Sequence, residues 1–369
     1  MNNIKKRLQG FFKAFTYKIY SLFHGDIKGK ILANQDSRIK IDKVVKEKKI
    51  NYKIFKVNNG RLYTDTIHDA AIILDNLIVD GPSYQLRPIN NAKVEENIVF
   101  KKGTPRKKIK LKGTILSLLT GGAGNNNYFH WMYDVLPRIG ICEEAFDISK
   151  IDYFLLPSLE KRFQKETLDM LNVPKEKRLS SKTYRHIVGS EIITTQHPYC
   201  LKNATYDITN IPVWISQWLK EKYLKTKDDK NDTPKKVYID RSDSESNIKK
   251  LRSIINEKEV KDFLKNRGFE FISLGHFSFK EQIKIMNNAE IVVGLHGAGF
   301  ANFCFCKPKT KILEFKSNTA GKMYENLAKN NNLVYKVISC RPEKSDYQNQ
   351  YGHIKIPLEE LEKSIESFS

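Results

Sequence analysis

Short apolar runs alternate with longer segments of helical periodicity over most of this chain, and this alternation limits the possible folds more than any other feature. Strands separated by helices can lie parallel to one another, so the pattern predicts parallel sheets of the α/β class. It is most regular after residue 236, where a Rossmann-like domain of short βα units is expected. The strands predicted there are 237–239, 269–273, 291–293, 311–315 and 333–338, and the helices are 256–266, 279–286, 323–328 and 358–367.

The chain is long enough for two domains, because 369 residues exceed the roughly 100–200 of a typical domain. A polar segment at 225–234 has no apolar anchor and ends in proline, as a linker does. Ligands bind at the carboxyl ends of parallel strands, so two such domains would present their ligand sites to a cleft between them. We therefore expect a helix at 1–24, an N-terminal Rossmann-like domain at 25–224, a linker at 225–236 and a C-terminal Rossmann-like domain at 237–369.

The N-terminal domain is expected to begin with strands. Apolar runs at 71–74 and 77–79 are split by Asp75-Asn76, which is a turn signal. Further strands are predicted at 97–100 and 114–119. The elements expected after them are helices at 128–144, 159–171 and 213–224, and strands at 152–156 and within 186–195.

Residues 1–24 carry a separate pattern. Apolar residues recur at helical spacing and basic residues lie largely between them, which predicts a basic amphipathic helix in an anionic membrane interface. Docking on the protein's own core is the alternative. No apolar run reaches the ~18–20 residues of a transmembrane helix, and the apolar core of a signal peptide is missing. The apolar positions are Ile4, Leu8, Phe11, Phe12, Phe15, Ile19, Leu22 and Phe23, and the basic ones are Lys5, Lys6, Arg7, Lys13 and Lys18.

Charge and cysteine content restrict the partners. The chain has 64 Lys and Arg against 42 Asp and Glu, a net charge of +22. Such an excess of positive charge favours an anionic binding partner, such as nucleic acid, an acidic membrane face or a phosphate-bearing substrate. A lysine-rich surface without a partner is the alternative. The five cysteines lack paired ligand spacing, which argues against zinc and fits a reduced, cytosolic compartment.

The segment 291–299 reads as a buried strand followed by a sharp glycine-containing turn and the start of a helix. Glycines let the backbone approach a ligand closely, and the free N–H groups of a helix start suit a phosphate. A plain strand-to-helix turn is the alternative interpretation. The turn consists of His296, Gly297, Ala298 and Gly299.

A second candidate site lies in the segment 127–138, which begins with Asn127. His130 and Asp134 are four residues apart and therefore share one face of a helix. An imidazole beside a carboxylate can act as an oriented general base. Arg138 continues that face and can bind an anion, and Pro137 predicts a kink or an early helix end. A surface ladder that only stabilises the helix is the alternative.

Polar side chains follow two predicted strands of the C-terminal domain. Arg241 comes after the strand 237–239, where a guanidinium can bind a diphosphate with two hydrogen bonds, and Ser242 begins a polar loop. Asn302 extends the glycine turn. Glu314 lies in the next strand, where a carboxylate often holds a ribose hydroxyl pair. A solvated turn and an exposed strand end are the respective alternatives.

Together these segments resemble glycosyltransferase family 61, and in particular its bacterial capsule and lipopolysaccharide members. The resemblance rests on the run 127–138, on Tyr238 to Arg241, on Asn256-Glu257 and on Gly294 to Asn302, in the family's order. It implies a GT-B architecture, in which two Rossmann-like domains face across a cleft. It also implies inverting transfer from a nucleotide sugar without an obligatory metal or other cofactor.

The implied reaction assigns roles to the candidate residues. Without a metal, the leaving diphosphate must be neutralised by helix N-termini and cationic side chains. Inversion is a single displacement and needs one general base, for which His130 and Asp134 both remain candidates. The expected donor-binding residues are Arg241, Ser242, His296, Gly297, Ala298, Gly299, Asn302 and Glu314, and the acceptor or anion residues are Asn127 and Arg138.

The resemblance also suggests partners and a location. We expect a UDP-linked donor, a glycan or lipid-linked glycan acceptor, and a peripheral place on the cytoplasmic face of the cell membrane. A non-enzymatic protein that binds nucleic acid or another polyanion is the alternative, but the lysines follow no recognition motif. A dinucleotide oxidoreductase is disfavoured because no G-x-G-x-x-G follows a strand.

Overall fold

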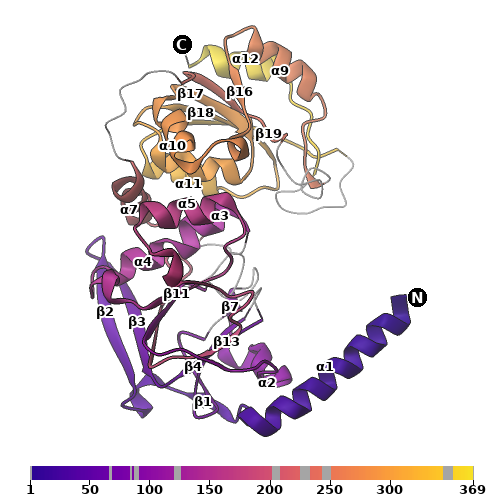
Figure 1. Ribbon diagram of the computed structural model, residues 1–369. Helices are drawn as coiled ribbons and strands as arrows, with labels where there is room; N and C mark the ends of the chain where they lie inside the picture. Colours follow the sequence, from indigo (N-terminus) through magenta and orange to yellow (C-terminus); the bar gives the residue numbers. More distant parts are fainter. Residues whose placement is uncertain are drawn as a thin grey trace. The chain divides into compact units, whose positions relative to one another are not determined.

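The computed structural model describes residues 2–65, 69–83, 85–86, 91–119, 126–201, 208–224, 233–242, 251–343 and 352–368. Its contacts divide the chain into two compact units, Met1–Asp207 and Ile208–Ser369 (Figure 1). Helix α7 (Val213–Tyr223) groups with the second unit, although the sequence analysis assigned it to the first. Two residues before it, Ile211 donates its backbone N–H to Asn326 of the second unit at 2.9 Å. Most of the predicted linker, 225–232, lies outside the described residues.

The first unit contains a six-stranded sheet in the order β12-β11-β10-β14-β3-β2. Its first four strands are parallel, and β3 and β2 are added antiparallel. β10 therefore has the next strands of the chain on one side and the later β14 on the other. The direction of winding thus reverses between β10 and β14. In sheets of this kind ligands bind where the winding reverses, at the carboxyl ends of the two strands on either side. The bounds are β2 (Ile39–Lys46), β3 (Ile50–Asn58), β10 (Thr114–Ser117), β11 (Tyr153–Leu156), β12 (Arg178–Ser180) and β14 (Glu191–Thr195).

A second, mixed sheet of six strands packs against the first, so the first unit is more than the Rossmann-like domain that the sequence predicted. Apolar residues of both sheets, such as Ile72 and Ile187 from one and Val57 and Ile115 from the other, form one core. The strand order of this second sheet is β1-β6-β5-β4-β13-β9. The bounds are β1 (Gly29–Ile31), β4 (Arg61–Thr64), β5 (Ala70–Leu74), β6 (Leu77–Val79), β9 (Ile109–Lys110) and β13 (His186–Val188).

Two local predictions in this unit have different outcomes. The turn at Asp75-Asn76 joins β5 to β6, and both residues have the positive φ that a tight hairpin turn requires. The strand predicted at 97–100 is wrong, because helix α2 (Ile98–Lys102) begins there and Asn97 caps it by accepting the N–H of Val99. The remaining elements here are β7 (Gln85–Leu86), β8 (Asn91–Ala92), α5 (Arg162–Met170) and the 3-10 helices η1 (Ala33–Gln35), η2 (Val94–Glu96), η4 (Ile148–Lys150) and η5 (Lys175–Lys177).

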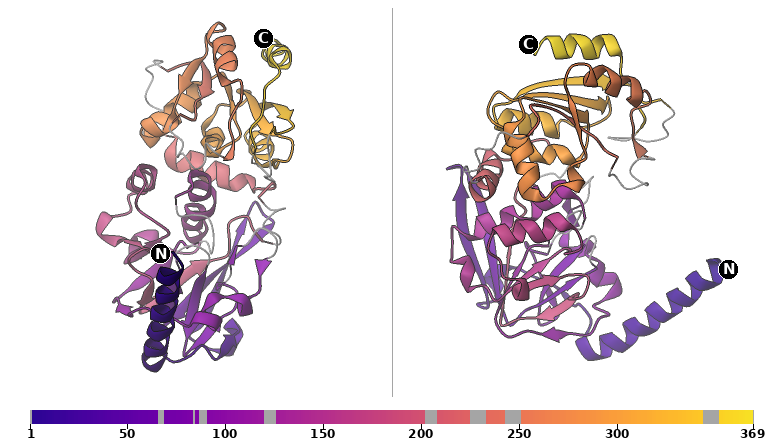
Figure 2. Two further views of the ribbon diagram at one scale, coloured as in Figure 1. Left: turned by 90° about the vertical axis from the view of Figure 1, so that its right-hand side faces the viewer. Right: turned by 45° about the horizontal axis from the view of Figure 1, so that its top comes forward.

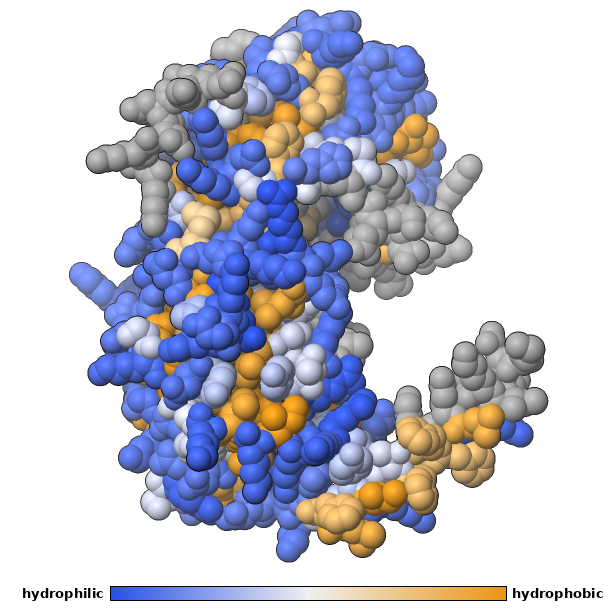
Figure 3. Space-filling view, viewed as in Figure 1, coloured by the Kyte–Doolittle hydropathy of each residue, from blue (hydrophilic) through white to orange (hydrophobic). Residues whose placement is uncertain are grey.

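The chain begins with helix α1 (Asn2–His24), as predicted. Its end is tied to the first unit, since His24 Nε2 lies 2.9 Å from the carbonyl oxygen of Arg106 and the ring of Tyr17 lies against Gly103. Figure 3 shows apolar side chains gathered along this helix. No helix in the described parts of the chain is both long and apolar enough to cross a membrane. The side chains of Leu8, Phe11, Phe12, Phe15, Leu22 and Phe23 are 64 to 87% exposed.

The second unit is built on a five-stranded parallel sheet, in agreement with the five predicted strands. Its order, β16-β15-β17-β18-β19, again reverses the direction of winding, this time between β15 and β17. This is the doubly wound arrangement. The strands are β15 (Lys236–Ile239), β16 (Glu270–Ile272), β17 (Ile291–Leu295), β18 (Lys311–Ser317) and β19 (Val334–Cys340).

Helices cover both faces of this sheet (Figures 1 and 2). On one face, Val260 and Leu264 of α9 and Leu361 of α12 pack on strand residues such as Val293. On the other face aromatic rings meet, and Tyr223 of α7 contacts Phe279 of α10 edge-on at 5.0 Å between centroids. The bounds are α9 (Glu257–Lys265), α10 (Phe279–Asn288), α11 (Met323–Asn330), α12 (Leu358–Glu366) and the 3-10 helices η6 (Leu274–His276) and η7 (Ala298–Phe305).

Candidate active site

The helix that follows β10 is interrupted at the predicted catalytic residues. It consists of α3 (Tyr128–His130), a π-helical turn η3 (Trp131–Val135) and α4 (Pro137–Cys142). The N–H of Leu136 bonds to the carbonyl of Trp131, five residues back, at 3.1 Å. Such widened turns often occur at functional sites, and Pro137 is tolerated because the first residue of a helix needs no N–H. The sequence predicted an irregularity at Pro137, and the structure has a π-helical turn at Trp131–Val135, just before the proline.

His130 and Asp134 form the predicted pair across this turn. His130 Nδ1 lies 2.8 Å from Asp134 Oδ2. Asp134 is fully buried, whereas 18% of the His130 side chain is exposed. Because Nδ1 faces the carboxylate, Nε2 is the ring nitrogen left for a substrate. Asn127 caps α3 and accepts the backbone N–H of His130 at 3.3 Å.

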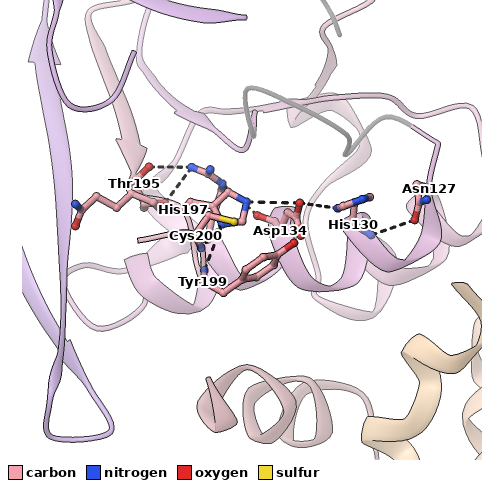
Figure 4. Close-up of polar contacts among 9 residues, drawn as sticks. Asn127, His130, Asp134, Thr195, His197, Tyr199 and Cys200 are labelled. Atoms are coloured by element: carbon pink, nitrogen blue, oxygen red, sulfur yellow. Dashed lines mark hydrogen bonds and ion pairs between the residues drawn. The ribbon is translucent and has the colours of Figure 1, made fainter. Parts of the chain in front are cut away.

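A second histidine, which the sequence analysis missed, lies on the other side of Asp134. His197 follows β14, and its Nδ1 accepts the backbone N–H groups of Tyr199 and Cys200 at 3.3 and 3.0 Å. Its ring proton is therefore on Nε2, which lies 3.5 Å from Asp134 Oδ2. Figure 4 shows the three side chains in a row. His197 stands two residues beyond β14, so the strand-end rule that selected the other candidates also applies to it.

Burial and charge set the protonation of this row. Burial alone would raise the pKa of Asp134, but His130 and His197 outweigh it and hold the pKa well below the usual range. Burial lowers the pKa of His197, and its contact with Asp134 offsets only part of that effect. At neutral pH Asp134 is therefore ionised and His197 is neutral. The carboxylate then holds a proton on His130 Nδ1 and leaves the lone pair of Nε2 to accept one.

Arg138 was expected to bind an anion, but its side chain is buried and bonded to the protein. Its side chain is 1% exposed, and Nη1 donates to the carbonyl oxygen of Thr195 at 2.8 Å while Nε donates to that of Asp134 at 3.2 Å. The guanidinium thus bonds the π turn to the end of β14. It supports the site from inside and is not placed to bind an anion at the surface.

In the second unit the predicted donor residues meet at the reversal between β15 and β17. Arg241 follows β15, and its Nη1 donates to the carbonyl oxygen of His296, which follows β17, at 3.2 Å. A Cβ on Gly297 would lie 3.5 Å from the Arg241 guanidinium carbon, at van der Waals distance, so this guanidinium lies directly against the turn. Gly297 is extended, with φ of 173°, so the turn carries no strain. Ala298 is the first residue of η7.

The loop after β15 also reaches the end of β16. Ser242 Oγ lies 2.6 Å from Ser273 Oγ, and the Ser242 N–H donates to Asp240 at 2.8 Å. The ends of three neighbouring strands therefore meet at this point. The rest of this loop, residues 243–250, lies outside the described residues. Within the described ranges no group of three or more His, Cys, Asp or Glu side chains has the geometry to hold a metal ion.

Two of the donor-binding predictions fall on buried side chains. Asn302 is fully buried, and its amide donates to Gln282 at 3.2 Å. Glu314 is 1% exposed, and its two carboxylate oxygens are held by His296 and Tyr335. In this structure neither side chain is open to a ribose.

In both units, polar side chains lie where the winding of parallel strands reverses, the place where α/β enzymes bind substrates at strand ends. The family model of glycosyltransferase 61 matches residues 128–313, half of the chain. The match begins at α3 and ends within β18, so it includes His130, Asp134, Arg241 and His296. The chain belongs to this family, and the protein is a glycosyltransferase. No curated protein matches it significantly.

Proposed function

We propose that the protein transfers a hexosyl or pentosyl group from a nucleotide sugar to a glycan acceptor, with inversion and without an obligatory metal. The observation that carries the proposal is the row His130–Asp134–His197, in which one buried carboxylate orients one partly exposed imidazole. Such an arrangement suits a reaction that needs a single general base.

His130 is the base in this proposal, and Asp134 orients it. Asp134 has no exposed surface, and burial keeps it from contacting an acceptor. His130 Nε2 removes the proton of the acceptor hydroxyl as its oxygen attacks the anomeric carbon. The bond from that carbon to the diphosphate oxygen breaks, and the nucleoside diphosphate leaves with the electron pair.

The leaving diphosphate is assigned to the turn after β17. Arg241 and the N-terminus of η7 supply positive charge there, His296 lies beside them, and each such contact contributes on the order of 1 kcal/mol or a few. Several must therefore act together to replace a metal ion. The proposal assigns the donor to the second unit and the acceptor base to the first, as a GT-B enzyme divides them.

The acceptor is proposed to be a glycan or lipid-linked glycan of capsule or lipopolysaccharide synthesis, used at the cytoplasmic face of the membrane. What supports the location is α1, whose apolar side chains are exposed and whose described basic residues Arg7 and Lys18 are exposed as well. Such a helix suits an anionic membrane interface.

A panel of nucleotide sugars, read by hydrolysis and by thermal shift in the presence of EDTA, tests the proposal. A UDP sugar should stabilise the protein, by roughly 2.7 kcal/mol at 100 times its dissociation constant, and should be hydrolysed slowly. Stabilisation that needs added Mg²⁺ or Mn²⁺ would contradict metal independence. A panel in which no nucleotide sugar binds or reacts would contradict the donor class.

A further inference from the structure

Basic side chains gather near one edge of the second sheet, on the face that turns away from the first sheet. Arg61 of β4 and Lys110 of β9 both pair with Val188 of the strand between them, β13. Residues paired across strands point to the same face, whereas the next residue along each strand points to the other. Leu62 and Ile109 are such neighbours and pack in the core between the sheets. Arg61 and Lys110 therefore share the outer face, two strands apart.

Arg61 is a buried cation without a counter-charge. The side chain is 7% exposed, and the guanidinium bonds only neutral groups. Nη1 donates to Thr104 at 2.9 Å and to His186 at 3.0 Å, and Nη2 donates to Asn76 at 2.7 Å. Burial lowers the pKa of Arg61 to about 10, so it is still charged at neutral pH, and no carboxylate of the described residues pairs with it. A buried charge without an opposite charge is costly, which points to an anion as the missing partner.

Lys108 adds a second cation at this place. It is half-buried and directly precedes β9. Burial lowers the pKa of Lys108, and the charges of Arg61 and Lys110 lower it further, so the three side chains lie close together. This setting differs from that of Arg138, the buried arginine that lies beside the ionised Asp134.

The two lysines belong to a strongly basic segment at the end of α1. His24 Nε2, in the last turn of α1, lies 2.9 Å from the carbonyl oxygen of Arg106 in this segment. Leu22 and Phe23 of the same turn are 87 and 76% exposed. Exposed apolar side chains beside clustered cations are the combination that binds an anionic membrane surface. Residues 101–112 include no acidic residue and seven basic ones, namely Lys101, Lys102, Arg106, Lys107, Lys108, Lys110 and Lys112.

We propose that Arg61, Lys108 and Lys110 bind the phosphate group of an anionic lipid headgroup, in the membrane on which α1 lies. The inference rests on the proposed membrane location and adds a specific contact to it. The phosphate supplies the negative charge that Arg61 lacks, and its oxygens accept hydrogen bonds from the guanidinium and the two ammonium groups. The apolar side chains of α1 enter the interface beside that headgroup.

Sedimentation with vesicles of phosphatidylcholine, with or without phosphatidylglycerol, tests the two lysines at physiological salt. Lys108→Gln/Lys110→Gln should weaken binding to the anionic vesicles about 30-fold, since each basic residue at the surface contributes about 1 kcal/mol. Lys48→Gln/Lys49→Gln, at the exposed turn between β2 and β3, removes the same charge and is the matched control. It should bind nearly as the wild type does, because salt screens charges that lie far from the headgroup.

Thermal melts test Arg61. They are made in the Arg241→Ala background, so that the proposed donor site does not contribute. A short-chain, water-soluble phosphatidylglycerol should raise the melting temperature of this protein, and the added Arg61→Gln change should abolish the rise. Arg61→Lys keeps the charge but not the forked geometry, so it should retain part of the rise, and it serves if the glutamine variant does not fold. Inorganic phosphate at equal ionic strength is the comparison ligand.

Four outcomes would overturn the proposal. Equal losses of vesicle binding in the two double variants would mean general attraction without a site. A melting temperature that the short-chain lipid raises equally with and without Arg61 would make this arginine purely structural. Stabilisation by inorganic phosphate alone would assign the site to a free phosphate. A wild type that binds no anionic vesicles would refute the proposed membrane location itself, whereas the first three outcomes leave that location intact.

Discussion

Asp134 illustrates how one residue can be essential to a site that it never exposes to substrate. Its carboxylate is shared by two imidazoles, of which only His130 is partly exposed. The sequence spacing showed that His130 and Asp134 share a helix face, but it left open which of them is the base. Burial favours His130, because a carboxylate without exposed surface cannot contact an acceptor hydroxyl.

Removing either member of this pair should therefore stop the chemistry and spare donor binding. We expect His130→Ala and Asp134→Asn each to lower turnover by roughly 10²–10⁴-fold, the usual contribution of general-base catalysis. The double variant should be little worse than the worse single one, since the two act as a unit. Steady-state kinetics and UDP titration measure both quantities. Near-wild-type turnover in both single variants would exclude the pair.

A different histidine should make the stability of the first unit depend on pH. His186 is buried, donates from Nδ1 to the carbonyl of Arg106 at 2.9 Å and accepts from Arg61 at Nε2, 3.0 Å away. Burial lowers its pKa to about 3, although the bond to Arg106 partly opposes this. The unfolded chain takes up this proton near pH 6.5, so the stabilisation is present above that pH and is lost as the pH falls towards 3.

Urea unfolding at about pH 7 and about pH 4.5 should show this loss. His186→Gln keeps a donor and an acceptor but does not titrate, so its stability should change less with pH. Part of the dependence of unfolding free energy on pH should remain in this variant, because the pKa of His197 is lowered as well. If the free energy of unfolding changed equally with pH in the variant and the wild type, His186 would not be the cause of the pH dependence.

At the scale of elements, the two glycines of the turn between β17 and η7 should have different roles, one in ligand binding and one in stability. A Cβ on Gly297 would lie 3.5 Å from the guanidinium of Arg241, whereas one on Gly299 would lie 3.2 Å from the buried side chains of Ile239 and Leu274. The first of these distances is an ordinary contact, but Gly297→Val adds two methyl groups beyond that Cβ, so it should displace Arg241 and weaken UDP binding in a folded protein. Gly299→Val should instead lower the melting temperature, because overpacking typically costs about 1–3 kcal/mol. Thermal melts and UDP titration of both variants distinguish these effects, and the reverse pattern would contradict them.

Helix α1 provides the second prediction at this scale. Tyr17 and His24 contact the first unit, so removal of residues 1–16 should leave the fold intact. The truncated protein should bind anionic liposomes less tightly, by about 1 kcal/mol for each basic residue lost near the surface. Phe11→Ser is a matched point variant, since that side chain is 75% exposed. Sedimentation with liposomes measures the effect, and aggregation of the truncated chain would favour docking of the helix on protein.

The sequence predicted elements best where one physical signal dominated. All five strands of the second unit are confirmed, and the three central ones, β15, β17 and β18, are buried parallel strands, which are short, continuous apolar runs in the sequence. Helix α2 was missed because its cap at Asn97 outweighs an apolar run of strand-like length. The second sheet of the first unit was not foreseen, since long-range pairing such as that of β4 with β13 leaves no local signal. The strand-end rule could have selected His197, but only the pairing of β10 with β14 shows that it lies beside Asp134.

For the whole molecule, the net charge of +22 has to be reconciled with an enzyme. If the charge serves only general attraction to phosphates and anionic membranes, the protein should bind heparin at low salt and lose it steeply as salt rises, without preference among DNA sequences. Arg241→Ala provides the decisive comparison. It removes one of the 64 basic residues and should leave heparin retention nearly unchanged, while UDP binding falls much more than uridine binding. Parallel losses of heparin and UDP binding, or one DNA sequence bound far more tightly than the others, would favour a polyanion-binding protein over the enzyme.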